Sequence, residues 1–250
     1  MTRYFIKLSY SGKNFNGWQI QPNDPSVQET IEKVLSTLLG EAILVVGAGR
    51  TDAGVHARNY IAHFDVTSPI LNLSDFMYKA NRFVHKDIVF HDIALAQEPL
   101  HSRFSATKRT YRYYIHQQKD PFLEGFSVYV HYKLDVELMN RAGEILLQYS
   151  DFTSFSKLHT DAKTNTCAVS LAQWHREGHR LIFTIAADRF LRNMVRAIVG
   201  TMLELGRGKI TFEQFRSIIE LKDRGKAGTS APPDGLFLEQ IDYDCTIFDK

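Results

Sequence analysis

The sequence predicts a protein of the α+β class with a mainly antiparallel sheet. Strand-like and helix-like periodicities mix without regular alternation, and residues 167–187 have the pattern of a hairpin. With 250 residues, of which 44% are hydrophobic, the chain can bury a sizeable core. The elements in residues 1–100 resemble those in 101–250, which indicates two similar α+β halves with no low-complexity linker between them.

The N-terminal half begins with a strand at 3–10, where apolar and polar side chains alternate. Ser26 and Glu29 form a capping box, and the apolar face of the helix that they open ends at Gly40. The other expected elements are strands at 43–46, 60–66 and 88–95 and a weaker helix at 74–83.

In the C-terminal half, Asp135 is expected to cap one helix, and Thr211 opens another with a capping box. A long helix is expected from about residue 189 to residue 205. The remaining elements are strands at 109–116 and 236–243 and the hairpin at 167–187, with its turn at 176–178.

Net charge, cysteine spacing and the length of the apolar runs limit the partners and the compartment that the protein can have. The formal net charge of +2 is almost neutral, so any surface for nucleic acid must be local. Cys167 and Cys245 lack paired spacing, which favours a reducing cytoplasm. Since no apolar run approaches the roughly 18 residues that a membrane span requires, we expect a soluble cytoplasmic protein with no membrane partner.

The segment GAGRTDAGVHAR, residues 47–58, has the glycine content of a phosphate-binding loop. A dinucleotide motif, however, requires glycine where Asp52 stands. A P-loop requires lysine and then serine or threonine after Gly54, where valine and histidine follow. We therefore expect no nucleotide cofactor.

What is left is a tight loop that presents the carboxylate of Asp52, flanked by Arg50 and Thr51. A lone aspartate in a loop is usually a turn or capping residue. The chain shows no serine-hydrolase elbow, and His175 and His179 fall in the hairpin rather than on the helix that a zinc pair needs. Asp52 is therefore the best candidate for a catalytic group, and we expect no metal.

Two basic segments could contact nucleic acid. Residues 101–114, HSRFSATKRTYRYY, combine arginines and a lysine with three tyrosines, as single-stranded RNA binding requires, although an ordinary exposed strand explains the same pattern. Within the long predicted helix, Arg189, Arg192 and Arg196 share one side and have no acidic residue four positions earlier. They either form a solvated basic face or need a partner, such as an RNA phosphate or Asp52.

Five blocks of the sequence resemble the signature of the TruA-type tRNA pseudouridine synthases. They occur in the family's order from residue 10 to the C-terminus, with one departure at Ser11, where the family commonly has aspartate. The blocks are YSGKNFNGWQIQ (10–21), GRTDAGVHA (49–57), KRTYRY (108–113), FLRNMVRAIVG (190–200) and TSAPPDGL (229–236).

This resemblance implies an isomerase that converts uridine to pseudouridine in the anticodon stem-loop of tRNA, at positions 38, 39 and 40, without metal or cofactor. It implies two halves similar to RNA-recognition motifs, joined in a central sheet flanked by helices, with the active-site cleft between them. Members of the family act as homodimers, so tRNA and a second copy of the chain are the expected partners.

The resemblance also assigns roles to residues. Asp52 matches the catalytic aspartate, Arg196 the basic residue paired with it, and Tyr111 the tyrosine that stacks on the target base. Arg50 and Thr51 are expected to contact the substrate because they flank the aspartate. Attack on the sugar carbon, addition to the ring and abstraction of a sugar proton all stay open for Asp52.

A non-catalytic RNA-binding protein with two recognition-motif-like halves is the alternative. The aromatic pattern of such modules is absent, and a binding protein would not need a carboxylate paired with an arginine. The sequence therefore favours the enzyme.

Overall fold

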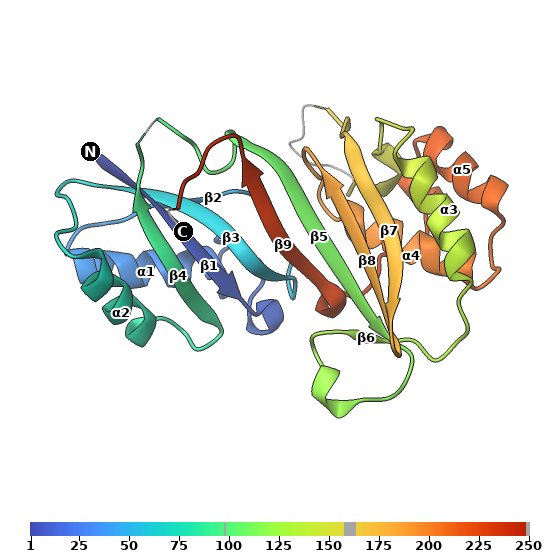
Figure 1. The fold of residues 1–250 in the computed structure, drawn as a ribbon, viewed down its shortest axis with the longest axis horizontal. Helices are drawn as coiled ribbons and strands as arrows, with labels where there is room; N and C mark the ends of the chain where they lie inside the picture. The colour runs from blue at the N-terminus through green and yellow to red at the C-terminus, as the bar shows by residue number, and fades with distance from the viewer. Residues whose placement is uncertain (98, 158–163, 249–250) are drawn as a thin grey trace. The chain divides into compact units, whose positions relative to one another are not determined.

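Figure 1 shows the computed structural model of the chain, which describes residues 1–97, 99–157 and 164–248. The chain divides into two compact units. The first comprises Met1–Thr107 and Leu238–Lys250, and the second comprises Lys108–Phe237. Each unit has its own strands, helices and buried apolar side chains.

The C-terminal part of the chain groups with the first unit because of strand β9. This strand (Leu236–Tyr243) is the neighbour of β3 (His56–Val66) in the sheet. The side-chain amide of Asn59 also donates a hydrogen bond to the carbonyl of Glu239 at 2.8 Å. The two halves expected from the sequence, 1–100 and 101–250, do not include this pairing of β9 with the first unit. Pairing between strands distant in sequence leaves no mark on local periodicity.

The strands of the first unit lie in the order β4–β1–β3–β9. Strand β1 (Thr2–Tyr10) runs antiparallel to β3 and to β4 (Ile88–Leu95), and the short strand β2 (Val45–Gly47) runs antiparallel to β3. The predicted strands at 3–10 and 88–95 are thus confirmed. The predicted strand at 60–66 begins earlier, at His56.

The two α-helices of the first unit begin within one residue of their predicted starts. Helix α1 (Val27–Leu39) is capped by Ser26, whose side chain accepts the N–H of Glu29 at 3.2 Å. It ends at Gly40, which has a left-handed φ of 69°. Helix α2 (Leu73–Phe83) packs against α1.

The strands of the second unit lie in the order β5–β8–β7. Strand β8 (Arg180–Ala187) runs antiparallel to both β5 (Ala106–His116) and β7 (Val169–Glu177). The expected hairpin is therefore confirmed, and its turn contains Gly178 with a φ of 60°. A short strand, β6 (Val128–Tyr129), adds to β5 in the parallel direction.

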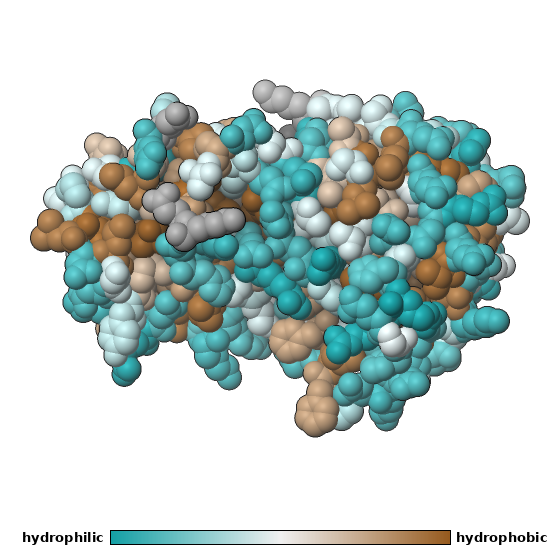
Figure 2. Space-filling model, viewed as in Figure 1, coloured by the Kyte–Doolittle hydropathy of each residue, from teal (hydrophilic) through white to brown (hydrophobic). Residues whose placement is uncertain are grey.

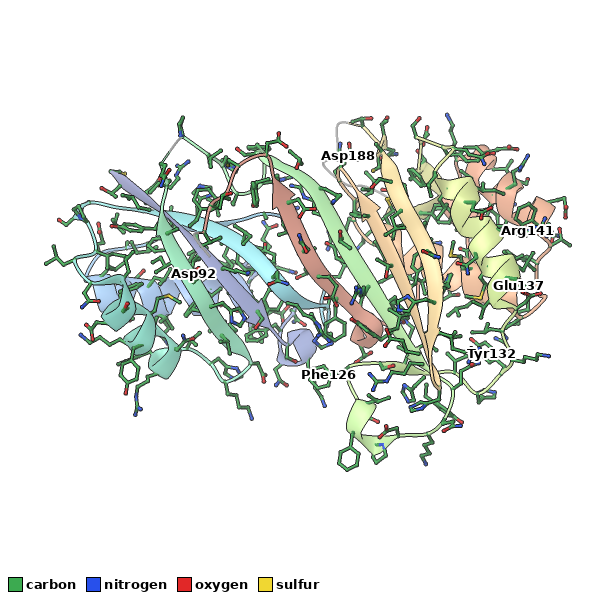
Figure 3. The ribbon with its side chains drawn as sticks, in the orientation of Figure 1. Asp92, Phe126, Tyr132, Glu137, Arg141 and Asp188 are labelled. Carbon is green, nitrogen blue, oxygen red and sulfur yellow. The ribbon has the colours of Figure 1, made fainter. Side chains whose placement is uncertain are left out.

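Three helices pack together in the second unit. Helices α3 (Val136–Leu146), α4 (Met194–Gly206) and α5 (Phe212–Leu221) contact one another, and α3 also contacts β7. Arg141 of α3, labelled in Figure 3, places its guanidinium 4.5 Å from the centre of the Phe212 ring. The predicted caps of α3 and α5 are confirmed, since Asp135 accepts the N–H of Leu138 and Thr211 forms a complete capping box.

The predicted start of the long helix at residue 189 was wrong. Helix α4 begins at Met194, because Asn193 takes a left-handed conformation with φ 66° and interrupts the helix there. The Asn193 side chain donates to the Ser230 hydroxyl at 2.7 Å, so a contact distant in sequence holds this bend. Arg189 and Arg192 precede the helix and do not share a helical face with Arg196.

The described chain is thus a mixed α and β structure whose mainly antiparallel sheet is flanked by five α-helices, which confirms the predicted fold class. Hydrophilic side chains predominate on the face shown in Figure 2, and hydrophobic residues emerge in several separate places. Among the described helices, none has both the length and the apolar character to cross a membrane. Short 3₁₀ helices occur at Gly12–Asn14, Pro121–Leu123, Thr153–Phe155, Arg224–Lys226 and Pro233–Gly235.

Candidate active site

Asp52 lies in the loop that joins β2 to β3. Its backbone carbonyl accepts the N–H of Val55 at 3.1 Å, which closes a turn in which Gly54 has a φ of 78°. Glycine adopts this conformation without a steric penalty, so the spacing of aspartate and glycine in the motif is what the turn requires. Asp52 itself is half-buried, whereas Arg50 is exposed.

A second segment, between β1 and α1, runs along this loop. The N–H of Trp18 donates to the carbonyl of Thr51 at 3.2 Å, and the N–H of Gly54 donates to the carbonyl of Phe15 at 3.2 Å. Gly17 has a φ of 91°, and a methyl group there would lie 2.4 Å from the carbonyl oxygen of Thr51. The two segments therefore approach as closely as backbones can, and a side chain at Gly17 would separate them.

The Thr51 side chain is turned inward. It is 8% exposed, and its hydroxyl lies 2.9 Å from the hydroxyl of Tyr10 in a buried hydrogen bond. The structure thus gives this side chain a part in supporting the loop. The expected substrate contacts of Arg50 and Thr51 stay predictions.

His56, which sequence reasoning did not single out, holds the far end of the loop. It is 1% exposed, and its Nδ1 accepts the N–H of Gly12 at 3.1 Å, which in the neutral ring places the proton on Nε2. A methyl group at Gly12 would lie 2.2 Å from the carbonyl oxygen of Val55. The signal for this contact was present in the sequence, since both residues fall within the blocks that resemble the family.

Tyr111 lies on β5 of the second unit. Along this strand Tyr111 is half-buried, Arg112 is exposed and Tyr113 is buried, so the alternation places the tyrosines on one face and the arginine on the other. The ring of Tyr111 meets that of Phe190 edge-on, at 5.1 Å between centroids and 83° between planes. This contact restricts the tilt of the Tyr111 ring.

Arg196 lies in the first turn of α4 and is half-buried. Its Nε donates to the carbonyl of Ala231 at 2.7 Å, and the N–H of Ala231 donates back to the carbonyl of Arg196 at 2.9 Å. One turn further along, a methyl group at Gly200 would lie 1.8 Å from the carbonyl oxygen of Thr229. The segment around Ala231 therefore fixes the direction in which the arginine leaves its helix.

Tyr113, near Arg196, is buried and forms a hydrogen bond that supports the fold. Its hydroxyl donates to the carbonyl of Pro232 at 2.8 Å. Burial raises the pKa of this phenol, while the charge of Arg196 lowers it to a smaller extent. Tyr113 is therefore neutral at pH 7 and serves as a donor.

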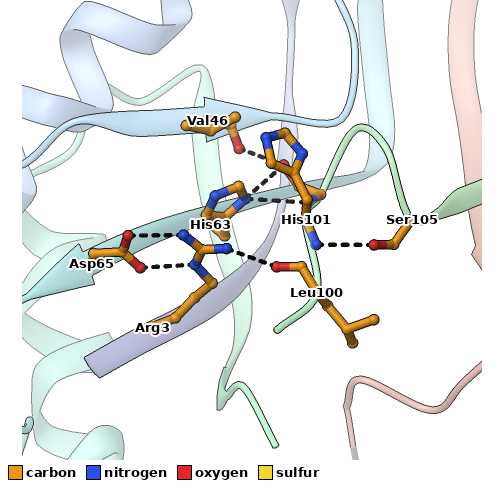
Figure 4. A network of polar contacts seen from close by, with 8 residues as sticks. Arg3, Val46, His63, Asp65, Leu100, His101 and Ser105 are labelled. Atoms are coloured by element: carbon orange, nitrogen blue, oxygen red, sulfur yellow. Dashed lines mark hydrogen bonds and ion pairs between the residues drawn. The ribbon is translucent and has the colours of Figure 1, made fainter. Parts of the chain in front are cut away.

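The first residues of the basic segment 101–114 are anchored in the first unit, as Figure 4 shows. The hydroxyl of Ser102 donates to the carbonyl of Val46 at 2.7 Å and lies 2.8 Å from Nδ1 of His63. Burial, with a further contribution from the Arg3 charge, lowers the pKa of His63 to about 4. This histidine is therefore neutral near pH 7, and Ser102 has a structural role.

Arg3 strengthens the same anchor. Its guanidinium forms a two-point contact with Asp65, at 2.8 and 2.9 Å, and donates to the carbonyl of Leu100 at 2.9 Å. Arg103 and Phe104 follow as exposed residues, with the guanidinium 5.6 Å from the ring centre. Ser102 is therefore held inside the first unit, and the exposed residues of the basic segment begin at Arg103.

The described histidine and acidic side chains do not gather into a metal site. Within the described ranges, no group of three or more histidine, cysteine, aspartate or glutamate residues is placed to hold a metal ion. His175 instead lies 3.1 Å from the carboxylate of Glu177 on the same strand. The candidate residues are therefore Asp52 in the first unit and Tyr111 and Arg196 in the second, and their assembly into one site stays a prediction.

Comparison with known proteins places this chain in a class of RNA-modifying isomerases. A sequence model of the family described as tRNA pseudouridine synthase matches residues 149–244. Together with the full-length similarities below, this match shows that the chain belongs to the tRNA pseudouridine synthase family.

The full-length relatives carry the name tRNA pseudouridine synthase A. That of Parabacteroides distasonis is 54% identical over 248 residues, which cover 99% of this chain and 98% of that protein. That of Bacteroides thetaiotaomicron is 53% identical over 253 residues, covering 100% of this chain and 94% of that protein. That of Acetivibrio thermocellus is 39% identical over 238 residues, covering 94% and 97%.

Proposed function

We propose that the protein isomerises uridine to pseudouridine in the anticodon stem-loop of tRNA, at positions 38, 39 and 40, with Asp52 as the catalytic group. The observation that supports this most directly is the loop itself, which holds a half-buried carboxylate on a backbone fixed from both sides. Relatives that match nearly the whole chain are named tRNA pseudouridine synthase A, which supports the formation of pseudouridine in tRNA.

The chemistry explains why a carboxylate is needed. The reaction breaks the bond between N1 of uracil and C1′ of ribose, turns the base, and joins C5 to C1′. The proton on C5 leaves and N1 takes one up, so the change is an isomerisation without redox chemistry. In each of the three open routes, Asp52 acts in its ionised form at the glycosidic region of the nucleotide.

Tyr111 and Arg196 are the proposed partners of this carboxylate. The target base must leave its stack, at a free-energy cost of a few kcal/mol. An aromatic face provides roughly 1–3 kcal/mol per stacked base, which offsets much of that cost. The edge-on contact with Phe190 supports this role because it restricts the tilt of the Tyr111 ring. Arg196 is proposed to stabilise the charge of Asp52 during the reaction.

We also propose that the protein acts in the cytoplasm as a homodimer, with one tRNA touching both copies. The resemblance to the family supports this assembly, and the almost neutral net charge of +2 indicates that cations must be concentrated locally to bind RNA. Sedimentation with and without tRNA tests it, because a tRNA complex containing only one copy of the chain would contradict the dimer.

The decisive experiment measures release of tritium from tRNA labelled at C5 of uridine. We expect release by the wild-type protein and no detectable release by Asp52→Asn, with tRNA affinity and thermal stability unchanged. Asp92→Asn is the matched control, since it makes the same chemical change on strand β4, and it should release tritium at the wild-type rate. Wild-type turnover by Asp52→Asn would refute the catalytic assignment, and tRNA binding without release by the wild-type protein would favour the RNA-binding alternative.

A double-mutant cycle tests whether the proposed residues act as one unit. Arg196→Met should lower the rate, and combining it with Asp52→Asn should make the enzyme hardly worse than Asp52→Asn alone, because both changes disable the same step. Arg196→Lys should rescue only partly, since an ammonium group does not reproduce the planar guanidinium. Normal activity of Arg196→Met would remove this arginine from the site.

A further inference from the structure

Three buried aromatic side chains surround the base of the loop that carries Asp52. They are Tyr10 on β1, Tyr60 on β3, and Trp18 on the segment between β1 and α1. We propose that the hydroxyl groups of Tyr10 and Tyr60 are positioning groups for catalysis, which hold the loop so that Asp52 meets the nucleotide in the productive geometry. This proposal rests on the proposed function.

The three rings form one packed group. Trp18 stacks on Tyr60 with ring centroids 4.1 Å apart and an angle of 27° between planes, and the Tyr10 ring meets Tyr60 at 5.5 Å and 61°. Their exposed fractions are 4% for Tyr10, 3% for Trp18 and 0% for Tyr60. Side chains buried to this degree do not touch a substrate, so any effect on catalysis must pass through the loop.

The two hydroxyl groups reach the loop on both sides of Arg50. The Tyr60 hydroxyl donates to the carbonyl of Gly49 and accepts the N–H of the same residue at 3.4 Å. The Tyr10 hydroxyl bonds to the Thr51 hydroxyl at 2.9 Å. The loop residues at 49 and 51 are thereby tied to neighbouring strands of the sheet, and Asp52 is the next residue along the chain.

The two tyrosines lie on adjacent strands of the sheet, which fix the positions of their hydroxyl groups. β1 and β3 are antiparallel neighbours, with Leu8 opposite Tyr60 and Tyr10 opposite Ala57. Because each tyrosine ring is held by packing and its strand by ladder hydrogen bonds, the position of each hydroxyl is set by the sheet.

Gly47, where the loop leaves β2, shows how little space this arrangement leaves. A methyl group there would lie 2.2 Å from the hydroxyl oxygen of Tyr60 and 2.5 Å from Cε2 of Trp18. The stacked pair therefore lies against the backbone at the start of the loop, and Tyr60 alone also bonds to Gly49. The glycine is required because the two rings occupy the space that a side chain would fill.

Removal of a hydroxyl tests positioning separately from packing. Tyr60→Phe and Tyr10→Phe keep the rings and their stacking but remove the bonds to Gly49 and Thr51. A displacement of about 1 Å at a catalytic group lowers rates by on the order of 100-fold. Since only part of the support is lost in each variant, we expect a roughly tenfold or greater fall in the single-turnover rate constant at saturating tRNA. The dissociation constant for tRNA should stay within about twofold, because the buried hydroxyls make no RNA contact.

Tyr4→Phe is the matched control. Tyr4 is 3% exposed, lies on β1 as Tyr10 does, and its hydroxyl accepts the N–H of Ile70 at 3.0 Å, away from the loop. It also loses the hydrogen bond of a buried tyrosine hydroxyl, in this case to a backbone N–H, so its melting temperature should fall about as far as that of Tyr10→Phe. Its single-turnover rate should stay within about twofold of the wild type.

The outcome separates this proposal from the function on which it rests. If the wild-type protein forms pseudouridine but Tyr60→Phe and Tyr10→Phe react at the rate of Tyr4→Phe, positioning by the hydroxyls is refuted. If both variants instead lose tRNA affinity with an unchanged single-turnover rate, the hydroxyls act on binding and the proposal is also overturned. Absence of pseudouridine with the wild-type protein would refute the function itself.

Discussion

Gly17→Ala should destabilise the protein through two separate effects. Gly17 has a φ of 91°, and an alanine in the left-handed region loses roughly 1–2 kcal/mol. The added methyl would also lie 2.4 Å from the carbonyl oxygen of Thr51, a backbone atom that cannot turn aside. Overpacking of this kind typically destabilises by about 1–3 kcal/mol, so we expect a total loss of about 2–5 kcal/mol in the free energy of unfolding.

Gly40→Ala isolates the first of these effects. Gly40 has a φ of 69°, and a methyl group there would meet nothing within 4 Å. It should therefore lose only the conformational part, roughly 1–2 kcal/mol. Urea unfolding of both variants gives the difference between their losses in the free energy of unfolding. That difference is the cost of the clash between the added methyl at Gly17 and the loop.

Activity gives an independent reading of the same change. At a temperature where Gly17→Ala is still folded, displacement of the Thr51 carbonyl should slow pseudouridine formation, while Gly40→Ala should react at the wild-type rate. Equal losses of stability in the two variants, with equal activity, would refute the reasoning that Gly17 exists to let the two segments meet.

Four further outcomes are expected. At Gly49, φ is not positive and an added methyl group would meet no atom within 4 Å, so Gly49→Ala should change the free energy of unfolding by less than about 1 kcal/mol. Tritium release should nevertheless fall if the nucleotide approaches this backbone. Unchanged release would place the nucleotide elsewhere. Tyr111→Phe should keep most substrate binding and Tyr111→Ala should lose it, and an inactive Phe variant with normal binding would show that the hydroxyl takes part in the chemistry. The pKa of His63 is lowered to about 4 in the folded protein, so the unfolded chain binds the proton more strongly between pH 6.5 and pH 4. The free energy of unfolding should therefore fall across that window as the pH drops, by at most about 3 kcal/mol. Urea unfolding of His63→Gln should show a flatter pH dependence there, and an unchanged slope would mean that His63 is not the group responsible. For the complex with tRNA, affinity should fall roughly tenfold or more between 50 and 200 mM salt, and a flat dependence would exclude a basic RNA surface.

The local elements of this protein follow from patterns that act over a few residues. Ser26 and Thr211 open helices because their side chains accept backbone N–H groups three positions later, and Gly40 ends one because it adopts a left-handed φ. Alternation along 3–10 predicted β1 because opposite faces of a strand meet different surroundings. These signals need no knowledge of the rest of the fold.

Asn193 shows where such reasoning fails. The residue types on either side of it have helical periodicity, so the sequence predicts one uninterrupted helix. The bend is held by a bond to Ser230, a residue 37 positions away, and no local pattern reports it. For the same reason, the helical face that the sequence predicts for Arg189 and Arg192 does not form.

At the candidate site, too, some features follow from local sequence and others depend on tertiary contacts. From the sequence alone came the loop, its central carboxylate at Asp52, and the conclusion that its glycines do not form a nucleotide-binding motif. Only the tertiary structure shows that Thr51 turns inward to Tyr10 and that Tyr60 holds Gly49, and only it shows that β9 returns to β3. The physical reason is that turns and caps depend on neighbours in the chain, whereas the support of a loop depends on side chains from strands that meet only after the sheet has formed.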